Sequence, residues 1–339
     1  MPELRKSPIL KRWVIISTER GKRPLDFKVV RDEPKEGFCP FCSGNEDKTP
    51  PEVLSYRDSG TGPDSPGWKV RVVPNKFPAL QIEGDLNKRG EGLYDMMQGI
   101  GAHEVVIESP DHKKNLHYLG NDHIESVFCA IRERMIDLKK DPRFRYILVF
   151  KNWGKEAGAS LEHSHMQLIA TPIIPKRAIE ELDGAKAHYA QKERCIYCDI
   201  INQELKDKRR IVYQNEYFIA LSPFAARFPF ETWVLPLKHI SAFEKTDRNC
   251  FPSLVDIMKT VLLKLDKALF DPPFNFIIHT SPCNGIDFNY YHWHIEIIPK
   301  LTKVAGFEWG SGFYINPTSP EEAAEELRNI DISGDNQNL

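Results

Sequence analysis

The sequence lacks the features that mark membrane-spanning, exported and nucleic-acid-binding proteins. No uninterrupted apolar run approaches the roughly 18 residues that a spanning helix needs, and residues 1–11 contain no apolar segment of signal-peptide length. The charges nearly cancel with a slight acidic excess, because there are 46 Lys and Arg side chains and 48 Asp and Glu side chains, for a net charge of −2. No GxxxxGK[ST] phosphate loop occurs. We therefore expect a cytoplasmic protein with no membrane and no nucleic-acid partner, and we exclude a P-loop kinase.

Cysteine is also scarce, with seven residues in 339, too few for a disulfide scaffold in a chain of this length. Four of the seven form two Cys-x-x-Cys pairs, Cys39 with Cys42 and Cys195 with Cys198. Without an export signal, this spacing indicates metal binding before redox chemistry or structural disulfides. The hydrophobic content of 41% and the charged content of 28% are those of a globular protein with a sizeable core.

What the chain does contain is an internal repeat of motifs in the same order. In each half a Cys-x-x-Cys pair precedes extended segments and a histidine, and then come an amphipathic helix, a strand and a His-x-His strand. The helices are expected over residues 121–140 and 250–269. The halves are expected to span 1–178 and 190–330, on either side of a charged helical stretch. We infer a duplicated unit of α+β class, in which each half has an antiparallel-rich sheet with helices packed on one side.

Each half supplies a closed Cys2His2 set, which is a ligand combination that zinc prefers. For either His112 or His239 alone, a surface histidine near a turn is an equally good reading. Both residues follow a strand, however, and both precede a His-x-His motif by nearly the same interval, so we favour ligation. The predicted ligands are Cys39, Cys42, His112 and His163 at one site, and Cys195, Cys198, His239 and His292 at the other.

The His-x-His motif of the first half has the chemistry of a nucleophile. Residues two apart on a strand point to the same face, so His163, His165 and Gln167 are expected on one face. If zinc holds His163, then His165 lies beside a rigid anchor, which suits in-line attack on phosphorus. Neutral imidazole is nucleophilic and forms phosphoramidates that are later opened. The alternative is that both histidines of the motif ligate one metal.

The segment His163-Ser164-His165-Met166-Gln167 resembles the His-x-His-x-Gln signature of the galactose-1-phosphate uridylyltransferase family, the transferase branch of the histidine-triad superfamily. The resemblance extends over nearly the whole chain and makes the two halves histidine-triad-like. It is carried by segments in the family's order: Trp13-Val14-Ile15-Ile16, Arg20-Gly21-Lys22-Arg23-Pro24, Cys39-Pro40-Phe41-Cys42, Asn75-Lys76-Phe77-Pro78-Ala79-Leu80, Ser109-Pro110-Asp111-His112 and Asn152.

The resemblance implies that His165 is the nucleophile of a nucleotidyl-histidine intermediate, with Gln167 and Ser160 at the phosphoryl group. It implies a double displacement. An NDP-sugar first transfers its nucleotide to the enzyme and releases a sugar 1-phosphate, and a second sugar 1-phosphate then takes the nucleotide from the enzyme. It also implies a homodimer in which residues 303–314 complete the neighbouring chain's site. The substrate-binding residues that it implies are Arg20, Arg23, Asn75, Phe77, Asn152, Lys303 and Phe307.

Departures from the family's pattern leave the substrate open. The best-known bacterial members have an Asp where Lys76 stands and a Gln near the position of Tyr314. They also bind iron in the second half through Glu and His, without a second Cys-x-x-Cys pair. We expect two structural zinc ions, with iron as the alternative at the second site. The second pair resembles a branch that includes a plant relative acting on ADP-glucose by adenylyl transfer to phosphate. Uridylyl transfer between UDP-glucose and galactose 1-phosphate is the family expectation, and ADP-glucose phosphorolysis is the alternative.

Other functional classes fit the sequence less well. A non-enzymatic zinc module that binds RNA or protein is opposed by the acidic balance and by the absence of a basic stripe with interleaved aromatics. A histidine-triad hydrolase is usually shorter and has a His where Gln167 stands. In the second half, His294 takes the place of His165, but Glu296 replaces the glutamine and the preceding small residues are missing. We therefore expect one active site per chain.

Overall fold

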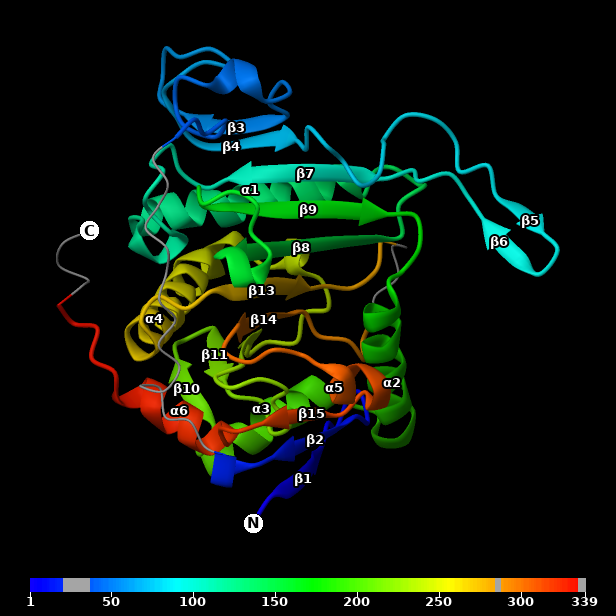
Figure 1. Ribbon diagram of the computed structural model, residues 1–339, viewed down its shortest axis with the longest axis vertical. Helices are drawn as coiled ribbons and strands as arrows, with labels where there is room; N and C mark the ends of the chain where they lie inside the picture. The colour runs from blue at the N-terminus through cyan, green and yellow to red at the C-terminus, as the bar shows by residue number, and fades with distance from the viewer. Residues whose placement is uncertain (21–36, 284–287, 335–339) are drawn as a thin grey trace.

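A ten-stranded sheet runs through both halves of the chain in the computed structural model, which describes residues 1–20, 37–283 and 288–334. Its strand order is β10-β11-β12-β14-β13-β8-β9-β7-β4-β3 (Figure 1). The strands of the first half are β3 (Leu54–Arg57), β4 (Trp68–Pro74), β7 (Ala102–Ile107), β8 (Tyr146–Trp153) and β9 (His165–Thr171). Those of the second half are β10 (Ile211–Gln214), β11 (Phe218–Leu221), β12 (Thr232–Pro236), β13 (Phe274–His279) and β14 (His294–Pro299).

The two halves repeat one strand order and are joined at the middle of the sheet. Strands β8 and β13 pair antiparallel, from Phe274 opposite Trp153 to Ile278 opposite Val149. The other neighbouring strands of this sheet pair antiparallel as well. The predicted α+β class with two related, antiparallel-rich half-units is confirmed, and the halves share one continuous sheet.

One face of the sheet is covered by the two helices that periodicity predicted. Helix α1 (Asn121–Leu138) and helix α4 (Phe251–Leu269) bury their apolar stripes against the strands and against each other in a single core. The stripe recurs every three to four residues, as helical geometry requires of a buried face. This core contains Val127 and Phe128 from α1, Leu254 and Val261 from α4, and Met166 and Leu168 from β9.

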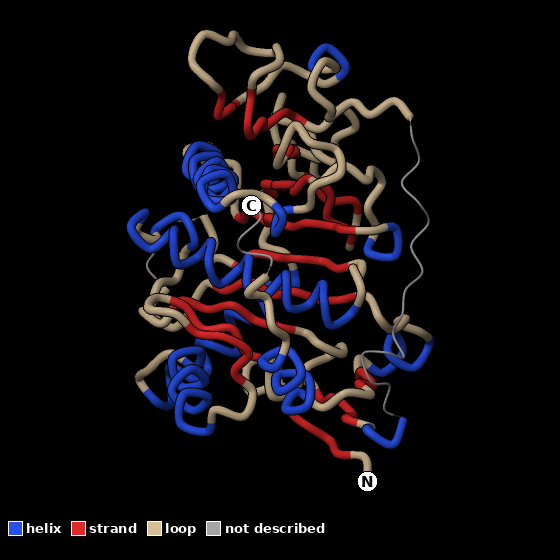
Figure 2. The backbone as a smooth tube through the Cα atoms, turned by 90° about the vertical axis from the view of Figure 1, so that its left-hand side faces the viewer, coloured by secondary structure: helices blue, strands red, loops and turns tan. Residues whose placement is uncertain are grey.

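The opposite face differs between the halves, and this difference positions the site. In the second half, α2 (Lys176–Lys192) and α3 (Ile196–Asp207) pack there on Ile219, Leu221 and Leu235, so that helices flank both sides of the strands (Figure 2). Ile219 and Leu221 alternate along β11 with residues that face α4, because side chains on a strand alternate between faces. In the first half, the corresponding face carries His165 and Gln167.

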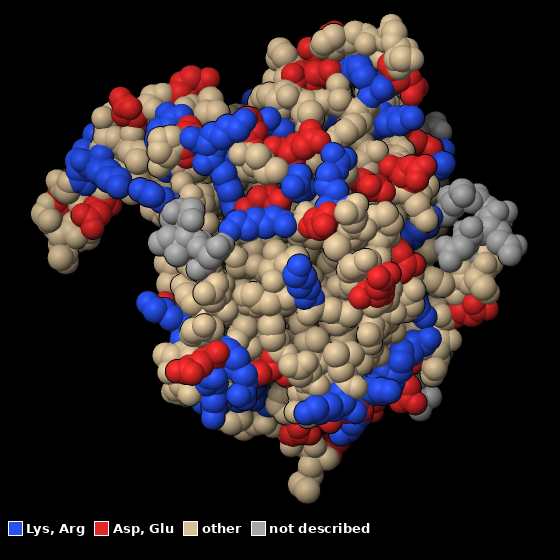
Figure 3. Space-filling view, turned by 180° about the vertical axis from the view of Figure 1, so that it is seen from behind, with Lys and Arg blue, Asp and Glu red and all other residues tan. Residues whose placement is uncertain are grey.

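Smaller elements surround this sheet. A three-stranded sheet combines β1 (Glu3–Lys6), β2 (Trp13–Ile16) and β15 (Tyr314–Asn316), with α5 (Gly306–Ser311) and α6 (Pro320–Asn329) nearby in sequence. A two-stranded ribbon, β5 (Arg89–Glu91) with β6 (Tyr94–Met96), projects from the body (Figure 1). The expected boundary between residues 178 and 190 falls inside α2. No helix in the described ranges has the length and apolarity to cross a membrane. Basic and acidic side chains are interspersed on the face shown in Figure 3.

Candidate active site and metal centres

The first Cys2His2 set comes together from three segments of the first half. Cys39 and Cys42 precede β3, His112 follows β7, and His163 lies just before β9. Their ligand atoms all lie within 4.8 Å of one another. Cys42 Sγ is 3.4 Å from His112 Nδ1 and 3.6 Å from His163 Nδ1, and Cys39 Sγ is also 3.6 Å from His163 Nδ1. Zinc bonds of about 2.3 Å to sulfur and about 2.1 Å to nitrogen give a tetrahedral S···N edge of about 3.6 Å. The set therefore has the size of a zinc tetrahedron.

The second Cys2His2 set has the same dimensions in the second half. The ligand atoms of Cys195, Cys198, His239 and His292 also lie within 4.8 Å of one another. Cys198 Sγ is 3.4 Å from His239 Nδ1 and 3.6 Å from His292 Nδ1. The structure thus brings the eight predicted ligands together as two groups, both of a size and donor chemistry that fit zinc.

Hydrogen bonds on the far side of two imidazoles fix which nitrogen faces the thiolates. His163 Nε2–H donates to the Ser109 carbonyl oxygen at 2.7 Å, and His292 Nε2–H donates to the Pro236 carbonyl oxygen at 2.9 Å. Each ring therefore presents an unprotonated Nδ1 to the sulfurs, as zinc-ligating histidines with a carbonyl partner do.

These two groups predict the metal content of the protein. The wild-type chain is expected to contain two zinc ions, while Cys42→Ser and Cys198→Ser each contain one, because loss of a thiolate removes most of the affinity of a four-ligand site. Elemental analysis of the purified proteins, prepared without added metal, measures this directly. Ser126→Ala is the control, because Ser126 is a partly exposed α1 residue that belongs to neither group. Retention of two zinc ions by either cysteine variant would contradict the assignment.

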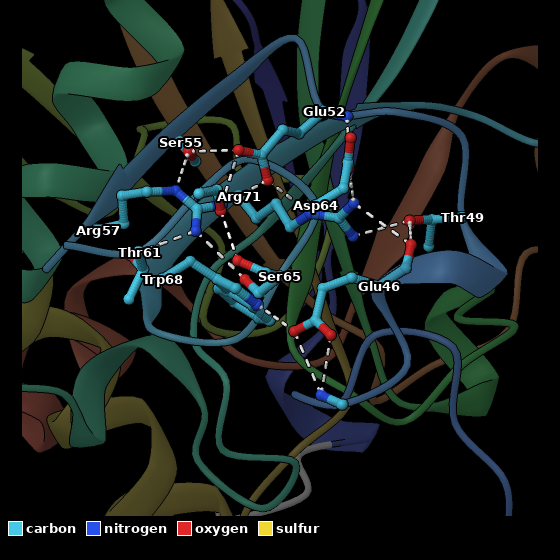
Figure 4. A network of polar contacts seen from close by, with 12 residues as sticks. Glu46, Thr49, Glu52, Ser55, Arg57, Thr61, Asp64, Ser65, Trp68 and Arg71 are labelled. Atoms are coloured by element: carbon cyan, nitrogen blue, oxygen red, sulfur yellow. Dashed lines mark hydrogen bonds and ion pairs between the residues drawn. The ribbon is translucent and has the colours of Figure 1, made fainter.

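The segment that carries Cys39 and Cys42 is also held by a polar network of its own (Figure 4). Glu46 accepts hydrogen bonds from the Gly44 backbone at 3.2 and 3.0 Å and from Trp68 Nε1 at 2.7 Å. Arg71 is 1% exposed, donates to Thr49 Oγ1 at 2.7 Å and forms an ion pair with Glu52 at 2.9 Å. Trp68 and Arg71 of strand β4 therefore hold the segment that carries Cys39 and Cys42 in place.

His165 lies two residues after His163 of the first metal group, and one of its ring nitrogens has no hydrogen-bond partner among the described residues. Its Nδ1–H donates to the His163 carbonyl oxygen at 2.7 Å, which leaves the lone pair of Nε2 available. Phe41 packs against the ring at an angle of 66° with 5.3 Å between centroids. Burial, together with the charge of Lys151, lowers the pKa of His165 and so favours the neutral, nucleophilic form at pH 7.

Gln167 lies two residues farther along β9 and is held by a residue that the sequence did not single out. Its Oε1 is 2.8 Å from His103 Nε2, on the neighbouring strand β7. His103 Nδ1 accepts a hydrogen bond from the Ala79 backbone at 3.2 Å, and its carbonyl oxygen accepts one from the Asn75 backbone at 2.8 Å. The only sequence signal for this residue was a histidine on a predicted strand, with no way to know which strand would lie beside β9.

A fully buried charged cluster lies directly behind the His-x-His motif. Lys151 Nζ donates to Glu108 Oε1 and to Ser164 Oγ, both at 2.6 Å, and Ser164 Oγ–H donates to Glu108 Oε2 at 2.6 Å. Both charged side chains are 0% exposed. Burial lowers the pKa of Lys151 against the opposing pull of Glu108. The cluster fixes the backbone of Ser164, the residue between the two histidines.

Of the predicted phosphate-side residues, Asn152 lies near the end of β8 and Ser160 lies on the loop between β8 and β9. This loop turns at Gly154 and Gly158, whose φ angles of 81° and 86° fall in the left-handed region that glycine enters without strain. Asn152 Oδ1 accepts a hydrogen bond from Asn275 of the second half at 2.8 Å, so its position depends on the junction of the halves. Ser160 is exposed at the end of the loop.

Two of the remaining predicted binding residues, Lys303 and Phe307, are not gathered around His165. Arg23 lies outside the described residues, and only the backbone of Arg20 is described. Lys303 and Phe307 are exposed at α5, which lies beside the second half and away from β9 (Figure 1). Phe77 is 84% exposed beside Asn75, whose Oδ1 accepts from the Phe77 backbone at 2.9 Å.

The counterpart of His165 in the second half is enclosed. His294 Nδ1–H donates to the His292 carbonyl oxygen at 3.2 Å, repeating the bond of His165, but its ring is stacked on His279 at 4.6 Å and lies 5.3 Å from the Trp233 ring. A third group of metal-binding residue types, Glu181, His279 and His294, is buried here. Burial opposes protonation of His279, but Glu181 and Glu296 outweigh it and raise the pKa to about 9. His279 therefore pairs with these carboxylates as a cation at neutral pH.

The chain is similar to known proteins over nearly its whole length. A family model described as the N-terminal domain of galactose-1-phosphate uridyl transferase matches residues 1–175, and one described as a domain of unknown function, DUF4921, matches residues 119–330. The chain is 38% identical to an ADP-glucose phosphorylase of Arabidopsis thaliana, with 98% of this chain and 94% of that protein covered. It is 31% identical to a galactose-1-phosphate uridylyltransferase of Thermotoga maritima, with 98% and 99% covered. A crystal structure of the Arabidopsis phosphorylase with bound ADP-glucose superposes with a TM-score of 0.83 at 37% identity and covers 98% of this chain and 100% of that one.

Proposed function

The chain belongs to the galactose-1-phosphate uridylyltransferase family, and from this premise we propose that it transfers a nucleoside monophosphate through a covalent intermediate on His165 Nε2. The observation that supports this role is the Nε2 of His165, which has no hydrogen-bond partner within residues 1–20, 37–283 and 288–334. The other ring nitrogen is bonded to the carbonyl of His163, a residue of the first metal group. A rigid neutral imidazole of this kind is pre-organised for attack on phosphorus.

The proposed reaction consists of two displacements at the α-phosphorus of an NDP-sugar. In the first, the Nε2 lone pair forms a P–N bond while the bond from the α-phosphorus to the bridging oxygen breaks, and the sugar 1-phosphate leaves with that electron pair. In the second, an oxygen of the acceptor phosphate attacks the same phosphorus and the P–N bond breaks, which returns the lone pair to Nε2. Gln167 and Ser160 are proposed to donate to the phosphoryl oxygens in both steps.

We propose zinc at both Cys2His2 sets, with structural roles. The first would hold His163 and, through its carbonyl, the ring of His165. The second would join α3 to the ends of β12 and β14 and lies far from the chemistry along the sheet (Figure 1). Zinc supplies folding free energy at such closed sites and takes no part in the displacement.

Two substrate pairs remain candidates, and ADP-glucose with inorganic phosphate is favoured. Identity is 38% to the Arabidopsis ADP-glucose phosphorylase and 31% to the Thermotoga uridylyltransferase. The second candidate is UDP-glucose with galactose 1-phosphate, the reaction type of the family's name. Asn75 and Phe77 are proposed to contact the nucleoside in either case. A homodimer is proposed as well, in which exposed Lys303 and Phe307 of one chain reach the neighbouring chain's His165.

Steady-state kinetics with both donor and acceptor pairs tests this preference. We expect kcat/KM for ADP-glucose with phosphate to exceed that for UDP-glucose with galactose 1-phosphate by about tenfold or more, which corresponds to roughly 1.4 kcal/mol in transition-state binding. The mixed pairs, ADP-glucose with galactose 1-phosphate and UDP-glucose with phosphate, show separately whether donor or acceptor is selected. A reversed ratio would assign the protein to uridylyl transfer.

A further inference from the structure

His103 lies where the loop of residues 75–79 meets the strand that carries His165 and Gln167. The Asn75 backbone donates to its carbonyl oxygen, and the Ala79 backbone donates to its ring nitrogen Nδ1. The Asn75 side-chain amide is also 3.1 Å from His103 Nε2. The ring is half-buried, and the rule that paired strands share faces places it on the same side of the sheet as Gln167.

The bond from Ala79 fixes the tautomer of His103. A backbone N–H can only donate, so Nδ1 must carry a lone pair and the neutral ring must carry its proton on Nε2. The Nε2–H then donates to Gln167 Oε1 at 2.8 Å. The Asn75 amide nitrogen can only donate, so its contact with the protonated Nε2 is not a hydrogen bond. Because Gln167 Oε1 accepts the hydrogen bond from Nε2–H, the NH2 group of Gln167 is turned away from His103.

The strand register shows where that NH2 group faces. Along β7 and β9, Ile107 is opposite His165, Val105 is opposite Gln167, and His103 is opposite Ile169. Gln167 therefore lies between the level of His103 and the level of His165. An amide whose oxygen is bonded on the His103 side presents its N–H donors on the His165 side, where the transferred phosphoryl group would lie.

We infer that His103 is a positioning residue, which orients Gln167 as a donor to the phosphoryl group and couples that orientation to the loop of residues 75–79. The inference rests on the proposed function. The loop carries the proposed nucleoside contacts Asn75 and Phe77. A shift of the loop therefore moves the His103 ring through its bond to Ala79, and with the ring moves the Nε2–H that donates to Gln167. The His103 imidazole then contacts both the loop that would bind the nucleoside and the glutamine that would stabilise the phosphoryl group.

Two substitutions separate the bonds that His103 makes. His103→Gln places an amide N–H near the position of Nε2 and keeps the donor to Gln167, whereas His103→Asn reaches only as far as Nδ1 and keeps the bond to Ala79. The rate of nucleotidyl-enzyme formation in single-turnover experiments is expected to fall roughly 10- to 100-fold in His103→Asn and to stay within about threefold of wild type in His103→Gln. The donor KM is expected to change less than about threefold in both, because the lost interaction forms in the transition state.

A double-mutant cycle with Gln167→Ala shows whether the two residues act as a unit. In the Gln167→Ala background, His103→Asn is expected to cause no further loss of rate. Equal losses in His103→Asn and His103→Gln, or independent losses that multiply in the double variant, would overturn the inference. Either result could occur with a fully active wild-type enzyme, so it is distinct from failure of the proposed function.

The tautomer gives a readout that needs no activity. In imidazole ¹⁵N spectra of the holoenzyme, with His103 assigned by the signal missing in His103→Gln, we expect a protonated Nε2 and an unprotonated Nδ1. The opposite tautomer would contradict the inference even if the wild-type protein formed no adduct with either NDP-sugar.

Discussion

Replacing His165 by alanine is expected to reduce kcat for nucleotidyl transfer by a factor on the order of 10⁴ or more, with the fold intact. Removal of a covalent nucleophile lowers kcat by this much because the remaining binding interactions cannot replace the missing covalent bond. In the part of the chain that the structure describes, the side chain makes one hydrogen bond, to the backbone of His163, and one aromatic contact, to Phe41. The metal group retains its four ligands in the variant, so zinc content should be unchanged. Steady-state turnover with the better donor pair measures the effect.

The second half supplies the matched control for this variant. His294 repeats the position and the backbone bond of His165, but Trp233 and His279 cover its ring. His294→Asn, checked for folding by circular dichroism, is expected to retain turnover within an order of magnitude of wild type. Substantial turnover in His165→Ala together with loss in His294→Asn would move the chemistry to the second half.

The second large effect concerns stability. Lys151→Met is expected to lower the free energy of unfolding by about 3–5 kcal/mol, because Glu108 would remain as a buried charge without its partner. Both side chains are 0% exposed, so water cannot replace the lost ion pair. Denaturant titration of the zinc-loaded protein, followed by fluorescence, measures the change in midpoint.

The double variant Lys151→Met with Glu108→Leu distinguishes loss of an ion pair from loss of packing. Replacing both charges with apolar groups of similar size is expected to recover most of the stability, since a buried ion pair contributes little beyond its own desolvation cost. If the double variant is as unstable as Lys151→Met, the cluster acts through packing, and the electrostatic explanation is wrong.

The secondary structure that carries the site could largely be predicted from the sequence. The helices expected over 121–140 and 250–269 are observed as Asn121–Leu138 and Phe251–Leu269. Their spacing of apolar residues is a local property of the chain. The two Cys2His2 groups were also predictable, because paired cysteines and repeated histidine spacings are visible without knowing the fold.

What could not be predicted depends on which strands become neighbours. The pairing of β8 with β13 joins the halves and brings Asn275 to Asn152, and no local pattern specifies it. The same holds for His103 beside Gln167. Helices were expected on one side of each half-sheet, but in the second half α2 and α3 also pack on the face opposite α4. They do so because both faces of these strands are apolar. The local sequence gives no sign that Lys151 and Glu108 are buried together as an ion pair.

The covalent intermediate is tested most directly by intact-protein mass spectrometry after incubation with ADP-glucose or UDP-glucose in the absence of acceptor. We expect an acid-labile mass increase of one nucleoside monophosphate, located on His165 by peptide mapping, absent in His165→Ala and removed when phosphate or a sugar 1-phosphate is added. No adduct in a wild-type protein that turns over the same substrates, or an adduct on any other residue, would contradict the account.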